Sequence, residues 1–212
     1  SRPKSIALHV EDRLIQNPNA VIETSINASW QRDLISILSA SVQKYEKPIN
    51  IAGLVVERRT GLVNAYAGSS SYIDNDRKGS VNYLTALRSP GSTLKPLIYA
   101  KALERKLIEE GHVFKDSQIQ RGGYTPSNFD KIFNGQVSLK EALNRSLNIP
   151  AIQTLELIGV DGFENSLRTF IAQDIMQNYK SGLTAAVGGF YLSAENLVEI
   201  YLEIADPGHS SK

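Results

Sequence analysis

Ser92 and Lys95 are residues whose types and spacing could support covalent chemistry. They lie three positions apart in Arg-Ser-Pro-Gly-Ser-Thr-Leu-Lys-Pro (88–96), and apolar residues near helical spacing follow them. A serine at a helix start has its hydroxyl near unpaired amides, and the residue three positions on shares its face. A lysine there could take the serine proton or stabilise the alkoxide if burial lowers its pKa. The same pattern also suits an N-cap serine beside a solvated lysine, so other residues are needed to distinguish the two interpretations.

Ser146 and Asn148 form a second polar pair, in Ala-Leu-Asn-Arg-Ser-Leu-Asn-Ile-Pro (142–150). A Ser-x-Asn spacing places two polar side chains on one side of a short turn. There they could hydrogen-bond both a lysine and a substrate amide.

These motifs resemble one known family. Ser-x-x-Lys followed by Ser-x-Asn begins the signature of penicillin-binding proteins and serine β-lactamases. Three blocks, at 88–96, 123–130 and 142–150, are similar to the transpeptidase domain of bifunctional class A penicillin-binding proteins, most of all the 1C type. The resemblance runs from about residue 21 to the last residue.

The resemblance implies a serine acyl-enzyme. Ser92 would attack the carbonyl of a D-Ala-D-Ala stem peptide, and Lys95 would activate it. Ser146 would pass the proton to the leaving amine, and Asn148 would bind Lys95 and the substrate amide. A second stem peptide would complete a peptidoglycan cross-link, and penicillins would acylate the same serine.

Other outcomes stay open. Class A β-lactamases carry an aspartate where this chain has Leu147, which favours a penicillin-binding protein, although a D,D-carboxypeptidase would fit the same residues. A domain that binds cell-wall peptide or β-lactams with little turnover is a further alternative. No cofactor or metal is expected, because His9, His112 and His209 are scattered without ligand spacing.

The resemblance also implies the fold. We expect an α+β transpeptidase fold, in which a five-stranded antiparallel sheet accompanies a large helical subdomain. Residues 1–20 are interpreted as a linker and 21–212 as a partial transpeptidase domain. The family's third motif, Lys-Thr-Gly or Lys-Ser-Gly, lies on a strand. Lys180-Ser181-Gly182 matches the Lys-Ser-Gly form of this motif, but the residues around it are typical of a segment that precedes a helix. We therefore expect the third motif and the last strands to be missing here, leaving an incomplete sheet.

The same reasoning sets expectations for the whole protein. Class A proteins carry a glycosyltransferase domain and a membrane anchor upstream, so the chain would act at the extracytoplasmic face of the inner membrane. The composition is that of an ordinary soluble globular protein, because 42% of the 212 residues are hydrophobic and 21% are charged. A net charge of +1 gives no reason to expect nucleic acid as a partner. The lack of cysteine excludes disulfides and thiol chemistry.

Hydrophobic periodicity predicts the elements around these motifs. A helix from 28 to about 45 should follow an Asn27 cap, with Trp30, Leu34, Ile37, Leu38 and Val42 as its buried stripe. Strands are expected at 51–58 and 62–68, followed by a polar loop over 69–83. Further helices are predicted at 92–109, from a Ser138 cap to about 146, at 150–157, at 163–172 and from 193, with a short helical turn near 12–15.

The segment 122–135 is predicted to be a loop, rich in Gly, Pro and Asn. Tyr124 and Asn128 lie in it, within the second resembling block. We interpret them as structural, with Pro126 fixing a turn that Asn128 caps.

Overall fold

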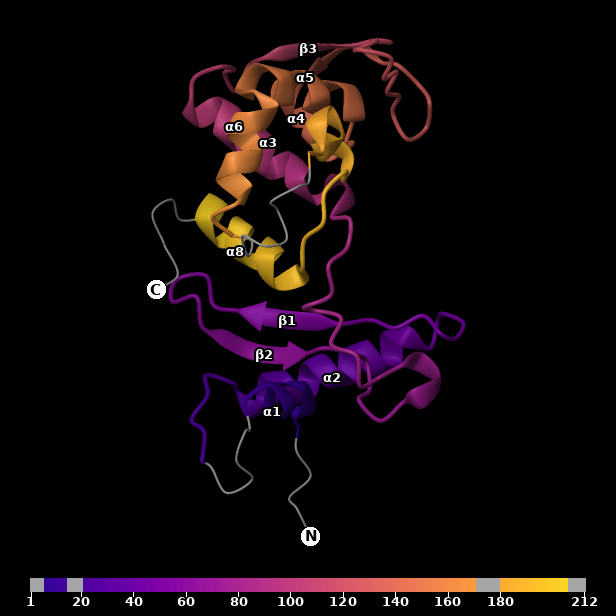
Figure 1. Ribbon diagram of the computed structural model, residues 1–212, viewed down its shortest axis with the longest axis vertical. Helices are drawn as coiled ribbons and strands as arrows, with labels where there is room; N and C mark the ends of the chain where they lie inside the picture. Colours follow the sequence, from indigo (N-terminus) through magenta and orange to yellow (C-terminus); the bar gives the residue numbers. More distant parts are fainter. Residues whose placement is uncertain (1–5, 15–20, 171–179, 206–212) are drawn as a thin grey trace. The chain divides into compact units, whose positions relative to one another are not determined.

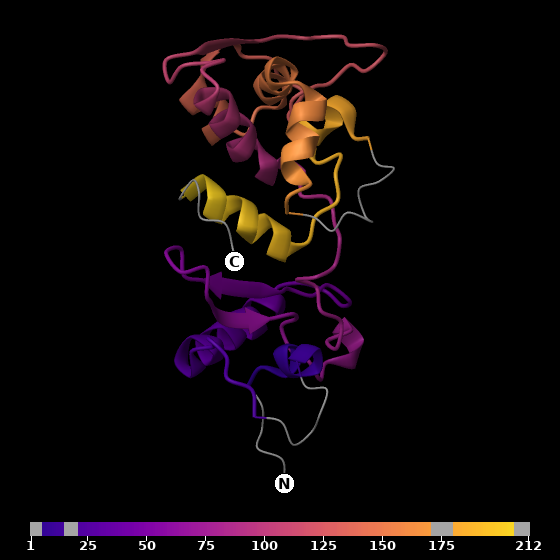
Figure 2. The ribbon, with the colours of Figure 1, turned by 60° about the vertical axis from the view of Figure 1, so that its left-hand side comes forward.

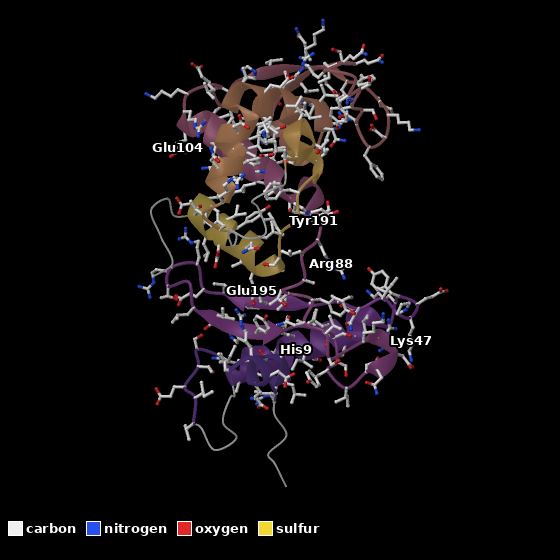
Figure 3. All side chains as sticks on the ribbon, viewed as in Figure 1. His9, Lys47, Arg88, Glu104, Tyr191 and Glu195 are labelled. Carbon is white, nitrogen blue, oxygen red and sulfur yellow. The ribbon has the colours of Figure 1, made fainter. Side chains whose placement is uncertain are left out.

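The computed structural model describes residues 6–14, 21–170 and 180–205. The chain forms two compact units. The first combines Ser1–Leu87 with Ser193–Lys212, and the second is Arg88–Leu192. Arg88 and Leu192 exchange two backbone hydrogen bonds at 2.9 Å, so the two ends of the second unit are tied together beside Tyr191 (Figure 3).

The first unit is built on a two-stranded antiparallel sheet of β1 (Gly53–Val56) and β2 (Val63–Ala67). Gly53 lies opposite Ala67, and the register shifts after Val55. Helix α2 (Ala28–Val42) packs on one face of the sheet, and α8 (Ala194–Ala205) lies on the other side (Figures 1 and 2). Strands β1 and β2 confirm the two strands expected at 51–58 and 62–68, although both are shorter than predicted.

Helix α2 begins where its cap predicts. The Asn27 side chain accepts hydrogen bonds from the Ser29 and Trp30 amides at 3.0 and 3.2 Å. Leu38 and Val42 are buried as expected. The prediction is wrong for Trp30 and Ile37, which are 50% and 62% exposed, because a sheet of two short strands covers only a narrow face of the helix.

The helix instead buries Gln31, which completes the hydrogen bonding of β2. Its side-chain oxygen accepts from the Tyr66 amide at 2.7 Å, and its nitrogen donates to the Tyr66 carbonyl at 2.9 Å. A single amide side chain thereby pairs with backbone groups that a further strand would otherwise satisfy.

Two smaller elements complete the first unit. Helix α1 (Leu8–Leu14) starts earlier than the turn expected at 12–15, because buried His9 fixes it by hydrogen-bonding the Gly79 carbonyl at 3.0 Å (Figure 3). The predicted polar loop over 69–83 contains a 3₁₀ turn, Asn75–Arg77. Its buried Arg77 guanidinium donates to the carbonyls of Tyr45, Glu46 and Ile49.

Helix α5 (Asn148–Ile158) forms the core of the second unit. Ile149, Ala151, Ile152 and Leu155 are fully buried. The helix packs against α3 (Lys95–Glu104), α6 (Val160–Leu167) and a 3₁₀ segment, Gly182–Val187, while α4 (Leu139–Asn144) precedes it. Pro150 was expected to open α5, but the helix starts two residues earlier.

Several boundaries differ from prediction. The helix expected over 92–109 is a 3₁₀ turn, Gly91–Leu94, followed by α3, and it ends at Glu104 because Lys106 adopts a left-handed φ of 55°. Helix α6 starts at Val160 and ends at Leu167, whereas its predicted end near 172 lies outside the described residues. Ser138 caps α4 through the Glu141 amide, as predicted.

A second two-stranded sheet was not predicted. Strands β3 (Val113–Asp116) and β4 (Gly135–Ser138) pair antiparallel, with the loop 117–134 between them. Each strand has four residues, too few for alternation to stand out in the sequence. Lys180-Ser181-Gly182 lies on no strand and leads into the 3₁₀ segment, as expected of a sequence that is not the third motif.

Candidate active site

Ser92 lies in the 3₁₀ turn Gly91–Leu94, directly before α3. It is exposed, and its hydroxyl makes no hydrogen bond with any residue that the structure describes. Pro90 occupies the cap position of the turn, and no side chain caps it. The interpretation of Ser92 as a helix N-cap is therefore wrong, and the hydroxyl is available for chemistry.

Lys95 is the most unusual residue of the site, because it is only 1% exposed. Its ammonium nitrogen donates to the Ser146 carbonyl at 2.5 Å, the Ser146 hydroxyl at 3.2 Å and Asn148 Oδ1 at 2.8 Å. Within the described part of the chain it has no carboxylate partner. Burial lowers the pKa of Lys95 from 10.5 to about 8. A solvated lysine at this position is thus ruled out.

Ser146 and Asn148 reach Lys95 from the junction between α4 and α5. Leu147 between them is 3% exposed and anchors the junction in the core, so its neighbours stay near the surface. Ser146 adopts a left-handed φ of 53°, which is uncommon for a residue with a side chain. Such backbone strain occurs where the surrounding structure imposes it, often at functional sites.

Asn148 is held by the loop that precedes β4. Its side-chain nitrogen donates to the Ser127 carbonyl at 2.8 Å, and its backbone amide donates to Asn128 Oδ1 at 2.8 Å. Asn128, 2% exposed, also donates to both oxygens of the fully buried Asp116 at 2.9 Å. Asn128 thus bonds both its own loop, through the Ile132 carbonyl at 2.8 Å, and the first turn of α5, which adds a second contact to the structural role expected from the sequence.

The turn that carries Ser92 packs closely against the 3₁₀ segment Gly182–Val187. Ser89 donates its hydroxyl to the Gly188 carbonyl at 2.6 Å. A Cβ atom added at Gly188 would lie 2.5 Å from Gly91 Cα, so the two backbones touch. Buried Glu164 fixes the start of the segment by accepting from the Ser181 amide at 2.9 Å and the Ser181 hydroxyl at 2.5 Å.

The structure thus brings three of the four sequence-predicted residues into direct contact, with Lys95 bound to Ser146 and Asn148. Ser92 lies on the same helical turn as Lys95, but no hydrogen bond joins their side chains in the described structure. An exposed hydroxyl next to a buried amine of lowered pKa is an arrangement that can form a covalent ester.

A family model described as "Penicillin binding protein transpeptidase domain" matches residues 51–205, which include all four of these residues. The chain belongs to this family. Among its relatives, penicillin-binding protein 1C of Escherichia coli is 33% identical over 192 residues, which are 90% of this chain and 25% of that protein. Penicillin-binding protein 1F of Bacillus subtilis is 34% identical over 65% of this chain and 18% of its own length.

Solved penicillin-binding proteins share the fold. Penicillin-binding protein 1A of Haemophilus influenzae superposes with a TM-score of 0.62 at 28% identity, over 73% of this chain and 23% of that one. PonA1 of Mycobacterium tuberculosis, solved with penicillin V, gives 0.72 over 86% of this chain and 50% of that one, at 19% identity. These relatives confirm both the expected α+β fold and the resemblance to 1C-type proteins. The chain spans about a quarter of the length of the 1C relative.

Near the site of this transpeptidase domain, sequence reasoning missed Asp116 and named Asn128 only as a structural loop residue. Asn128 lies in one of the three blocks that resemble the family, so the resemblance itself was a signal. Asp116 stands at the end of a strand too short to recognise, and nothing in its neighbourhood distinguishes it from a surface aspartate.

Proposed function

We propose that this chain carries the acylation site of a peptidoglycan D,D-transpeptidase, with Ser92 as nucleophile. The observation that supports it best is the buried Lys95. A lysine with no carboxylate partner among the described residues costs stability, and a fold tolerates that cost where a neutral amine is useful. With a pKa of about 8, roughly one molecule in ten holds the free amine at pH 7.

The proposed reaction has two halves. Ser92 Oγ attacks the carbonyl carbon of the penultimate D-alanine, and its proton passes to the neutral Lys95 amine. The bond to the terminal D-alanine breaks, and its nitrogen takes a proton from Lys95 through the Ser146 hydroxyl, which lies 3.2 Å from Lys95 Nζ. The amine of a second stem peptide then attacks the ester and forms the cross-link, while the proton it loses passes through Lys95 to Ser92 Oγ, which is released as the free hydroxyl.

The substrate and setting of this reaction are part of the proposal. The relatives are named as penicillin-binding proteins, and we infer stem peptides as substrates and β-lactams as covalent inhibitors. We infer action in the extracytoplasmic envelope, next to a glycosyltransferase domain. In the portion of the chain that the structure covers, no helix is both long and apolar enough to cross a membrane.

Intact-mass spectrometry after incubation with penicillin V tests the nucleophile. The natural polypeptide that contains these 212 residues should gain the mass of one drug molecule. Ser92→Ala should gain none, whereas Thr93→Ala, which removes the hydroxyl of the next residue, should still be labelled. Labelling of Ser92→Ala, or no labelling of the unaltered protein, would refute the assignment.

A second assay separates transfer from hydrolysis. The protein is given a D-Ala-D-Ala pentapeptide with and without an acceptor amine. A transpeptidase gives the amine-linked product, whereas a carboxypeptidase gives only the shortened peptide, and a module that binds without turnover gives neither.

A further inference from the structure

Asp116 is a fully buried carboxylate with no cationic partner in the part of the chain that the structure covers. Four hydrogen bonds satisfy it instead. Asn128 Nδ2 approaches both of its oxygens at 2.9 Å, and Asn134 donates its backbone and side-chain N–H groups to Oδ2 at 2.9 and 2.6 Å. Burying a carboxylate whose partners are only neutral amides lowers the stability of the folded state, which suggests that its position serves a function.

Asn128 carries this interaction toward the active site. Its nitrogen donates to Asp116 and to the Ile132 carbonyl at 2.8 Å, so its oxygen must face the start of α5. That oxygen accepts from the amides of Asn148 at 2.8 Å and Ile149 at 3.4 Å. The orientation of Asn128 is fixed from both sides, because a flipped amide would turn its oxygen toward the carboxylate.

Asn148, fixed in this way, in turn orients an oxygen toward Lys95. With its backbone held by Asn128 and its side-chain nitrogen by the Ser127 carbonyl, its Oδ1 is aimed at Lys95 Nζ, 2.8 Å away. The loop at 127–128 thus grips Asn148 at two points, and Asp116 anchors the loop.

We propose that Asp116 and Asn128 act as a positioning pair that holds Asn148 against Lys95 and so sets the rate of serine acylation. This inference rests on the proposed function, because it concerns the same acylation step. Neither residue touches the reacting atoms. Both act through Asn148, and that separates a positioning role from a general contribution to stability.

Asn134 supplies a matched control. It donates to the same carboxylate, but its side-chain oxygen accepts from Arg145 at 2.7 Å, and it makes no hydrogen bond to Asn148. Asn134→Ala and Asn128→Ala each truncate a side-chain amide bonded to Asp116, and only Asn128→Ala also frees Asn148. Differences in acylation between them therefore report positioning.

The experiment measures the second-order rate of acylation by a fluorescent penicillin, in the natural polypeptide that contains this chain. Asn128→Ala should slow acylation about tenfold in the unaltered background and less than about twofold in an Asn148→Ala background, where no side chain remains to be positioned. Asn134→Ala should change the rate less than about twofold in either. Asn128→Ala should also move the acid limb of the pH–rate profile to lower pH. Asn148 Oδ1, which favours the ammonium form of Lys95, is then no longer held in place, and the pKa of Lys95 falls.

A milder variant keeps the test valid if Asn128→Ala does not fold. Asp116→Asn preserves the shape of the side chain and leaves an oxygen for Asn134, but its amide nitrogen takes the place of Oδ1, which contacts only Asn128, and so faces the Asn128 nitrogen with donor against donor. Asp116→Asn should slow acylation in the unaltered background and change it less than about twofold in the Asn148→Ala background.

The outcomes separate cleanly. For Asn128→Ala, or for Asp116→Asn in its place, equal losses in both backgrounds or no loss at all would overturn the positioning role while leaving the proposed function in place. If the unaltered protein is not acylated, the proposed function fails, and this inference fails with it.

Discussion

The contact between Gly188 and Gly91 gives a sharp test of how the Ser92 turn is positioned. A methyl group at Gly188 would lie 2.5 Å from Gly91 Cα and 2.7 Å from Gly91 N. Ordinary contacts between such atoms are about 3.5–4 Å, so Gly188→Ala must separate the two backbones by about 1 Å. Because Ser92 follows Gly91 directly, the displacement reaches the proposed nucleophile.

Two penalties add up in this variant. Gly188 has a left-handed φ of 95°, which costs a residue with Cβ about 1–2 kcal/mol. Steric overlap in a packed region costs about 1–3 kcal/mol more. We therefore expect the free energy of unfolding to fall by about 2–5 kcal/mol, and acylation to slow by up to about a hundredfold for a displacement of this size.

Gly182→Ala is the matched control, because Gly182 lies in the same 3₁₀ segment with a φ of 58° and no atom within 4 Å of an added Cβ. It should bear only the backbone penalty, about 1–2 kcal/mol, and acylate normally. Urea unfolding measures the stability of both variants, and penicillin labelling measures acylation. If the two variants lose equal stability and both acylate like the unaltered protein, the close approach does not position Ser92.

Three further perturbations follow from buried charges. The lowered pKa of Lys95 means that the folded state releases its proton before the unfolded state, so stability should rise between pH 8 and 10.5, by about 3 kcal/mol. Lys95→Met should abolish acylation and remove this rise, which urea titrations of both proteins across pH would reveal. Glu164→Gln should change stability by less than about 1 kcal/mol, because Oε1 alone accepts both Ser181 bonds, whereas Glu164→Ala should cost about 1–3 kcal/mol by thermal unfolding. Arg77→Lys should cost about 2–4 kcal/mol, since an ammonium cannot reproduce the guanidinium bonds to three carbonyls, while exposed Arg59→Lys should be neutral in the same melts.

The sequence predicted correctly those helix ends that depend on a few neighbouring residues. Asn27 and Ser138 cap their helices because each supplies an oxygen where an amide has no partner, and this can be read from a few neighbouring residues. The four candidate site residues could be named for a similar reason, since Ser-x-x-Lys and Ser-x-Asn are short motifs. The contact of Ser146 and Asn148 with Lys95 depends on the fold, and the sequence indicated it only through the family resemblance.

Non-local signals were missed or misjudged. Strands β3 and β4 pair across the loop 117–134, and neither carries enough alternation to be recognised alone. Trp30 belongs to an apolar stripe, yet whether a stripe is covered depends on the width of the sheet beneath it. The role of Asp116 is visible only once Asn128 and Asn134 have converged on it from a loop many residues away.

The proposed mechanism gives one reason for burying both the Lys95 ammonium and the Asp116 carboxylate, each of which lowers stability. In the proposed mechanism, Lys95 can accept the Ser92 proton only if its amine is shielded from water. Its position must then be set by neutral oxygens rather than by a carboxylate, which would favour the ammonium form. Asn148 supplies such an oxygen, but a side-chain amide needs support of its own. In our proposal, Asp116 provides that support indirectly, through its hydrogen bonds with Asn128. A negative charge placed behind two amides can thus stiffen the site without forming a salt bridge with the lysine, which would raise its pKa and switch off the base.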